Sequence, residues 1–264
     1  MYPTLISFGN FSITTQSVFN LLAFLTTAFV YWRKTREEHY QQDQAFDALI
    51  ISSVVGLIVG RIGFMVINFG KVGQSLWNWF NVIDHPGSLE LFGLLGASLY
   101  LYRFAGKKKW DQFEVLDFWL LAVSAGMVLK QLGSFFVGTG FGYETNLPWG
   151  MVFPGVFAKY HPVQLYMAIF FLGLYIYLYS VEYKYRTFLW YRAGKKTAQT
   201  GFLTCIFLIA TGLFMLLLQL VKPAQLVVNQ WRLDYFVYGF VFLFGAGLLY
   251  KKSGRSINFK NKKN

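Results

Sequence analysis

The chain has 264 residues, of which 55% are hydrophobic, 20% aromatic and only 14% charged. Soluble domains usually carry about 25% charged residues, so this composition argues against a soluble globular protein. A net charge of +12 is also typical of nucleic-acid binding, but the positions of the basic residues favour another explanation, and we expect no nucleic acid as a partner.

Seven apolar runs follow one another along the chain. Crossing the hydrocarbon core takes roughly 20 residues of helix, and each run is long enough or nearly so. They cover about residues 15–32, 45–69, 88–104, 113–137, 162–180, 201–221 and 235–250. We therefore predict an all-α fold, a polytopic membrane helix bundle of about seven transmembrane helices. The first run has no basic region before it, so we interpret it as a retained span and not as a signal peptide.

Most of the 24 basic residues lie in alternate loops and in the tail. They are Arg33, Lys34 and Arg36, then Arg103 and Lys107 to Lys109, then Lys184, Arg186, Arg192, Lys195 and Lys196, and finally Lys251, Lys252, Arg255, Lys260, Lys262 and Lys263. Basic loops face the cytoplasm, which predicts an N-out, C-in topology. We expect one transmembrane domain over residues 1–250 and a basic cytoplasmic tail over 251–264. Glu114 and Asp117, near the inner end of the fourth run, should face water or pair with lysines.

Two of the outer loops are longer than a simple turn. Residues 71–87 contain several aromatic rings and predict a segment lying on the membrane surface. Residues 138–160 are rich in Gly and Pro, which predicts a small folded cap on the outer face. The single cysteine, Cys205, and the three histidines show no metal-ligand spacing, so we expect no metal and no cofactor. No internal repeat is evident.

Ionisable groups at membrane depth are costly and are therefore candidates for function. Arg61, inside the second run, has two possible roles: it could bind a phosphate or carboxylate as a clamp, or it could pack between helices with its guanidinium bonded to backbone carbonyls. Lys130, beside Gln131, could serve as a cation that binds a ligand, or its side chain could extend to the membrane–water interface. For His161, a catalytic role and packing of the cap onto the bundle both remain open. Glu90 could pair with Arg61 or Lys130.

Several motifs resemble the prolipoprotein diacylglyceryl transferase family of bacteria. They are TNLPWG at 145–150, FPG at 153–155 and HPVQLY at 161–166, with similar residues at 2–13 and GRIG at 60–63. The resemblance covers nearly the whole chain. It implies transfer of a diacylglyceryl group from phosphatidylglycerol to a lipobox cysteine in lipoprotein biosynthesis, with glycerol phosphate leaving. It also implies phospholipid and prolipoprotein as partners, and a multi-pass protein of the bacterial cytoplasmic (inner) membrane.

The chain departs from the family's pattern at polar positions. The family's Arg falls on Gln131, its two Asn on Ser134 and Val137, its Glu on Thr139, its His on Phe92, its Tyr-Gly on Gln16-Ser17, and its later Arg, Glu and Arg on Met215, Gln219 and Lys222. Each change except the last removes a charge or a polar group. Lost phosphate-binding cations bear directly on a reaction that releases a phosphate.

Two hypotheses follow from these departures. In the first, the chain is a divergent lipid transferase. Its lipid phosphate is then held by Arg61, Lys130, Lys222, Gly142 and Tyr166, and the catalytic candidates are His161, Lys130 and Gln131. In the second, it is a catalytically inactive relative that binds lipid, lipoprotein precursor or a membrane partner. Under the first hypothesis Arg61, Lys130 and His161 should line one cavity open to lipid, and under the second they should point apart or be capped by aromatic residues.

Overall fold

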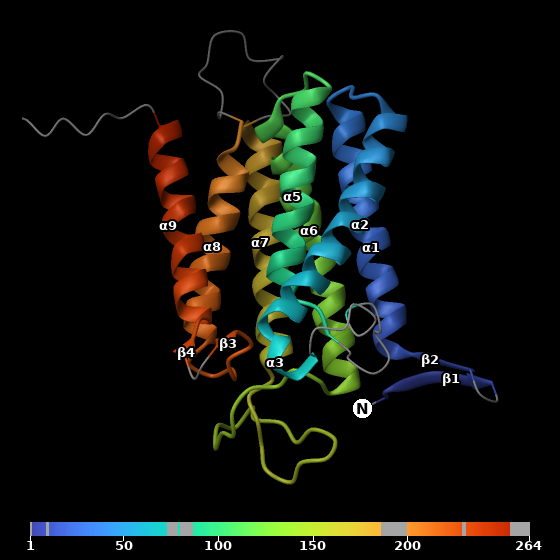
Figure 1. Ribbon diagram of the computed structural model, residues 1–264, viewed down its shortest axis with the longest axis vertical. Coiled ribbons are helices and arrows are strands. Elements are labelled where there is room, and N and C mark those ends of the chain that lie inside the picture. The colour runs from blue at the N-terminus through green and yellow to red at the C-terminus, as the bar shows by residue number, and fades with distance from the viewer. Residues whose placement is uncertain are drawn as a thin grey trace, which may run out of the picture.

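The computed structural model describes residues 2–8, 11–72, 79, 87–185, 200–228 and 231–253, and most of these residues form a helix bundle (Figure 1). Its seven long helices are α1 (Thr15–Glu37), α2 (Gln42–Ile67), α5 (Glu90–Lys107), α6 (Gln112–Val137), α7 (Val163–Tyr185), α8 (Phe202–Leu218) and α9 (Asp234–Lys252). Each coincides with one predicted apolar run, so the all-α prediction is confirmed. The remaining described elements are α3 (Phe69–Val72) and two antiparallel pairs, β1 (Thr4–Phe8) with β2 (Phe11–Thr14) and β3 (Val227–Val228) with β4 (Trp231–Arg232).

The surface of the bundle is that of a membrane protein. Among the described helices, α2, α6 and α7 are long and apolar enough to cross a membrane, and α8 is apolar but shorter. Large apolar side chains such as Leu57, Ile169 and Leu243 are 67–72% exposed on the outside. Such exposure is expected where the hydrocarbon of a bilayer is the solvent.

Helix α6 is the central element and packs against α1, α5, α7 and α8. Glycines set two of the helix contacts, because small residues let backbones approach closely. A Cβ on Gly126 would lie 2.7 Å from the carbonyl oxygen of Ala23 in α1, and a Cβ on Gly93 in α5 would lie 2.9 Å from that of Gly56 in α2.

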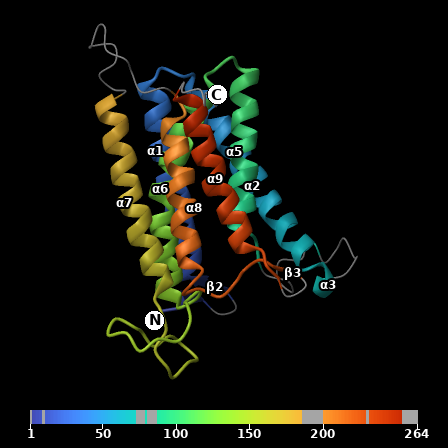
Figure 2. The ribbon, with the colours of Figure 1, turned by 90° about the vertical axis from the view of Figure 1, so that its left-hand side faces the viewer.

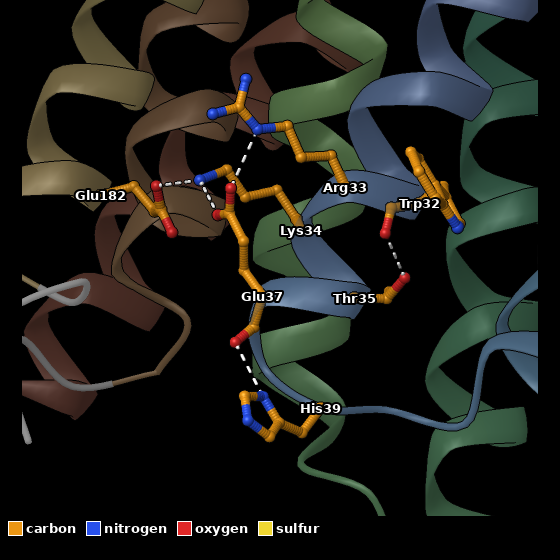
Figure 3. A network of polar contacts seen from close by, with 7 residues as sticks. All are labelled: Trp32, Arg33, Lys34, Thr35, Glu37, His39 and Glu182. Carbon is orange, nitrogen blue, oxygen red and sulfur yellow. Dashed lines mark hydrogen bonds and ion pairs between the residues drawn. The ribbon is translucent and has the colours of Figure 1, made fainter.

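One end of the bundle carries a buried ion pair between α1 and α7 (Figure 3). Lys34 Nζ lies 2.7 Å from Glu182 Oε2 and 2.7 Å from Glu37 Oε2, and the Lys34 and Glu182 side chains are only 3% and 2% exposed. Arg33 Nε donates to Glu37 Oε1 at 2.9 Å. A buried charge needs a partner, so Lys34 and Glu182 depend on each other.

Asp117 does not face water, which is the first of the two environments expected for it. Asp117 is 1% exposed, and its carboxylate accepts hydrogen bonds from the Gly201 N–H at 2.7 Å and from the Thr204 N–H and hydroxyl at 2.8 and 2.6 Å. The first N–H groups of a helix lack partners within that helix, and Asp117 of α6 supplies one for the start of α8. Glu114 accepts a hydrogen bond from the Tyr40 hydroxyl.

The turn between α1 and α2 matches the turn between α5 and α6. His39 and Lys109 both adopt left-handed backbone conformations, with φ of 63° and 59°. The next residues, Tyr40 and Trp110, each donate the backbone N–H to a carbonyl of the preceding helix at 2.9 Å. Their rings meet with centroids 4.7 Å apart. This local repeat is not evident in the sequence, because the two turns share few identical residues.

The opposite end of the bundle carries the β1–β2 hairpin, the 138–160 segment and the β3–β4 pair (Figures 1 and 2). The 138–160 segment is folded, with bridges from Tyr160 to Glu144 and Met151 and with Phe141 stacked on the buried Phe153 at 4.8 Å. Most of the 71–87 loop, and the tail beyond Ser253, lie outside the described residues.

Candidate functional site

A cavity of about 750 Å³ lies inside the bundle, with its wall built from α1, α2, α5, α6, α7, α8 and α9. Its apolar lining includes Leu21, Phe24, Leu57, Leu94, Met127, Phe171, Phe207 and Tyr238. Leu21 and Leu57 are also 57% and 72% exposed on the outside of the bundle. The cavity wall therefore reaches the bundle surface at α1 and α2, where acyl chains of a lipid would lie.

Polar side chains are gathered in one part of the same cavity. Glu90 at the start of α5, Lys130 and Gln131 near the end of α6, Gln164 at the start of α7 and Lys222 after α8 all line it. These helix ends meet at the end of the bundle that carries the 138–160 segment (Figure 1). An apolar chamber with one polar, cationic end fits an amphipathic anion.

Glu90 and Lys130 form an ion pair across α5 and α6. The pairing of Glu90 with Lys130, one of the two partners considered from the sequence, is confirmed. Their side chains are 50% and 28% exposed, and both line the cavity. The pair is thus accessible to a ligand.

Lys222 lies in the loop after α8 and is only 7% exposed. No hydrogen bond or ion pair joins its ammonium to a residue that the structure describes. Burial lowers the pKa of Lys222, and the nearby carboxylates of Glu90 and Asp234 oppose this only in part. A buried cation without a direct partner is costly, so an anionic ligand would relieve an existing penalty.

Gln164 and Gln219 each leave an acceptor unused. Both side chains are 1% exposed, and neither Oε1 atom has a hydrogen-bond partner among the described residues. Gln164 Nε2 donates to the Thr139 carbonyl at 2.7 Å, which fixes the amide with its oxygen free. Buried acceptors are usually satisfied, so a ligand hydroxyl is a suitable partner for Gln164, which lines the cavity.

The guanidinium of Arg61 is held by backbone carbonyls of the segment that precedes α5. Its Nε donates to the Trp79 carbonyl at 3.0 Å and its Nη1 to the Gly87 carbonyl at 2.8 Å, and the guanidinium lies 5.8 Å from the Phe64 ring centroid. Arg61 is not among the residues that line the cavity. These contacts favour the packing role, in which the arginine holds the following loop against α2.

His161 and Tyr166 connect the 138–160 segment to α7. His161 Nδ1 lies 3.3 Å from the Tyr166 hydroxyl, which accepts a hydrogen bond from Trp149 Nε1 at 2.9 Å. Neither residue lines the cavity. Of the three residues expected to share a cavity in an active enzyme, the structure thus places Lys130 there, together with Gln131 and Lys222, while Arg61 and His161 lie elsewhere.

Gly142 is buried where the 138–160 segment crosses the end of α8. Its N–H donates to the His161 carbonyl at 2.9 Å. A Cβ on Gly142 would lie 2.3 Å from the Val221 carbonyl oxygen and 2.9 Å from His161 Cβ. Since Val221 directly precedes Lys222, this contact also positions the buried cation.

The substitution Gly142→Ala is expected to destabilise the protein by about 1–3 kcal/mol, because the added methyl group overlaps a backbone carbonyl that cannot rotate away. A lower midpoint of thermal unfolding in detergent would show it. Gly173→Ala is the matched control, since no atom lies within 4 Å of a Cβ placed there. Equal midpoints for both variants would contradict this expectation.

The bundle and its cavity define a membrane protein with an internal chamber that has an apolar wall and a polar, cationic end. The chain belongs to the prolipoprotein diacylglyceryl transferase family, whose sequence profile matches residues 3–251. Relatives named phosphatidylglycerol–prolipoprotein diacylglyceryl transferase include one from Polynucleobacter asymbioticus, 31% identical over 189 residues (67% of this chain and 72% of the relative). Others are from Clostridium tetani, at 24% over 225 residues (80% and 82%), and Thermotoga maritima, at 26% over 260 residues (94% and 84%).

Sequence reasoning did not single out Gln164 as a site residue. Gln164 lies in the HPVQLY motif that carries the family resemblance, so a polar residue inside an apolar run was the available signal. The exposed pair of Glu90 and Lys130 and the isolation of Lys222 depend on contacts between distant segments, which no local pattern specifies.

Proposed function

We propose that this chain transfers a diacylglyceryl group from phosphatidylglycerol to the cysteine thiol of a prolipoprotein, the two substrates for which its relatives are named. The observation that carries this proposal is the cavity, with an apolar wall and the unpaired ammonium of Lys222 at its polar end. The acyl chains would occupy the apolar part, and the headgroup would lie among Glu90, Lys130 and Lys222.

The reaction breaks the bond between a glyceryl carbon and a phosphate oxygen and forms a bond between that carbon and the cysteine sulfur. The thiol proton passes to water, and glycerol phosphate leaves with the bonding electron pair. Charge develops on the departing phosphate, and a cation held in a low-dielectric site stabilises it strongly. Lys222 fits this role best, and Lys130 supplies a cation beside the uncharged Gln131. Gln164 Oε1 would accept a hydrogen bond from a headgroup hydroxyl.

The proposal includes a topology. All seven long helices would span the bacterial cytoplasmic membrane, with the N-terminus and the polar end of the cavity outside. The support is the distribution of basic residues, because Arg36, Lys107 and Lys252 lie at helix ends on the side opposite the polar end of the cavity. The lipid would then enter from the outer leaflet between helices, and the prolipoprotein would meet the 138–160 segment.

A second candidate function is lipid or prolipoprotein binding without turnover. The observation that favours it is Phe92, which occupies the family's histidine position. Its ring packs closely on Gly63, where a Cβ would lie 2.9 Å from Phe92 Cγ. A ring in this position offers no base for the thiol, and His161 lies outside the cavity.

Mass spectrometry separates the two functions. The purified protein in detergent is incubated with phosphatidylglycerol and a lipobox peptide, and the peptide is analysed for a diacylglyceryl group on cysteine. We expect the adduct, and expect its loss when the lipid is omitted or the peptide cysteine is replaced by serine. An intact family member serves as the positive control. If the control forms the adduct and this protein does not, the transfer reaction is excluded and the second candidate, binding without turnover, is supported.

A further inference from the structure

We infer that Glu90 is a specificity-determining residue that makes the cavity select singly charged phosphodiester headgroups over doubly charged phosphomonoesters. The inference rests on the proposed function and deepens it, because it concerns the charge of the lipid that the same cavity accepts. Its basis is the number of charges at the polar end and the way they are paired.

Three charged side chains line the cavity among the described residues, namely Glu90, Lys130 and Lys222. Glu90 is ion-paired with Lys130, and Lys222 has no such partner among the residues that the structure describes. The cavity wall therefore presents one uncompensated positive charge, which matches the single negative charge of a phosphodiester.

Asp234 and Arg232 lie behind the wall near Lys222, and their charges oppose each other. Asp234 Oδ2 accepts the backbone N–H groups of Gln225 and Leu226, each at 3.1 Å. Arg232 Nη2 donates to the carbonyls of Gln219 and Lys222 at 3.2 and 3.3 Å. Asp234 is an anion and Arg232 a cation, and neither lines the cavity. They therefore leave the net charge of the cavity wall unchanged.

The unused acceptor of Gln164 adds a second requirement for the ligand. Its Oε1 is buried and has no hydrogen-bond partner in the described part of the chain, so the ligand should carry a hydrogen-bond donor close to its phosphate. A glycerol headgroup provides hydroxyl donors, whereas the phosphomonoester of phosphatidic acid provides none once it is fully ionised. Net charge and hydrogen bonding thus point to the same headgroup class.

A second negative charge on the ligand would meet the Glu90 carboxylate. A phosphomonoester carries about −1.5 to −2 charges at neutral pH, and like charges at short range repel each other. The same repulsion acts on glycerol phosphate, the phosphomonoester that the reaction releases. Glu90 would therefore favour substrate over product in the site.

The experiment compares the binding of phosphatidylglycerol and chain-matched phosphatidic acid to the purified full-length protein by native mass spectrometry at neutral pH. Wild type should bind phosphatidylglycerol more tightly. Glu90→Gln, which keeps the shape but removes the charge, should move the ratio of the two affinities at least tenfold toward phosphatidic acid. Glu144→Gln, on the exposed surface of the 138–160 segment, is the matched control and should leave the ratio unchanged.

The double variant Glu90→Gln/Lys130→Gln restores a single uncompensated cation, so it should recover most of the wild-type ratio. An unchanged ratio in Glu90→Gln, or a wild type that prefers phosphatidic acid, would overturn the inference even if the transfer assay yields the adduct. Conversely, a wild type that selects phosphatidylglycerol but yields no adduct would support the inference and refute the transfer reaction. Thermal unfolding midpoints verify that each variant is folded.

Discussion

The variant Lys34→Met is expected to lose about 3–5 kcal/mol of stability, because it leaves Glu182 as a buried carboxylate without its ion-pair partner. Glu182 is 2% exposed, and Lys34 Nζ at 2.7 Å is its ion-pair partner among the described residues (Figure 3). The loss is measured as a fall in the unfolding midpoint in detergent. Since the pair joins α1 to α7, limited proteolysis should cleave near these helix ends first.

Two companion variants separate the buried pair from a general effect of charge. Arg33→Met removes a cation that is 53% exposed, and an exposed pair contributes only about 0–1 kcal/mol. The double variant Lys34→Met/Glu182→Leu replaces both buried charges with apolar groups and should recover most of the stability. If the double variant is as unstable as Lys34→Met, the unpaired carboxylate is not the cause.

The same network predicts how stability depends on pH. Burial lowers the pKa of Lys34, but its hydrogen bonds with Glu182 and Glu37 raise that pKa by more, and the net shift is upward. The contribution of Lys34 is therefore present below the ordinary lysine value of 10.5 and lost as pH rises above it. Unfolding midpoints of wild type should fall in this alkaline range, whereas the corresponding fall in Lys34→Met should be smaller.

Replacing Lys222 with glutamine is expected to slow diacylglyceryl transfer by about 10²–10³, the usual cost of removing one group that stabilises transition-state charge. Among the described residues that line the cavity, Lys222 is the cation without a direct partner, so its charge is available to the ligand. The rate of adduct formation at saturating lipid measures the effect. Lys107→Gln, at the exposed end of α5 on the opposite side of the bundle, is the matched control. Equal rates for wild type and Lys222→Gln would exclude Lys222 from the reaction.

Alkaline pH should weaken phosphatidylglycerol binding earlier than an ordinary lysine would require. Burial lowers the pKa of Lys222 below 10.5, so its charge is lost within the range below that value. The stability of the lipid-free protein should change in the opposite direction, because deprotonation removes the cost of a buried charge. In Lys222→Arg, which stays charged, the decline in binding should move to higher pH. Lipid binding is the measurement of choice because the thiol substrate also titrates.

Helix positions were predictable from the sequence because each span needs a long apolar run, and all seven runs coincide with helices. Contacts between residues of different helices were harder to predict from the sequence. The sequence pattern predicted Glu90 and Lys130 as candidates and their ion pair as one of two alternatives. It did not predict that Asp117 in α6 would cap α8. His161 illustrates the same limit, because its motif is distinctive while its distance from the cavity depends on how the 138–160 segment folds over α7.

The matching turns of α1–α2 and α5–α6 imply that this part of the bundle is two copies of one helical hairpin. Helix α1 packs on α6 as α5 packs on α2, so exchanging the copies reproduces both contacts, as a pseudo-twofold axis requires. With His39 aligned to Lys109, the positions of Glu90 and Lys130 correspond to Asn20 and Gly60, and all four residues line the cavity. The chamber is thus lined by equivalent positions of two similar hairpins, of which only one bears the Glu90–Lys130 pair, while Gln164 and Lys222 come from outside both copies.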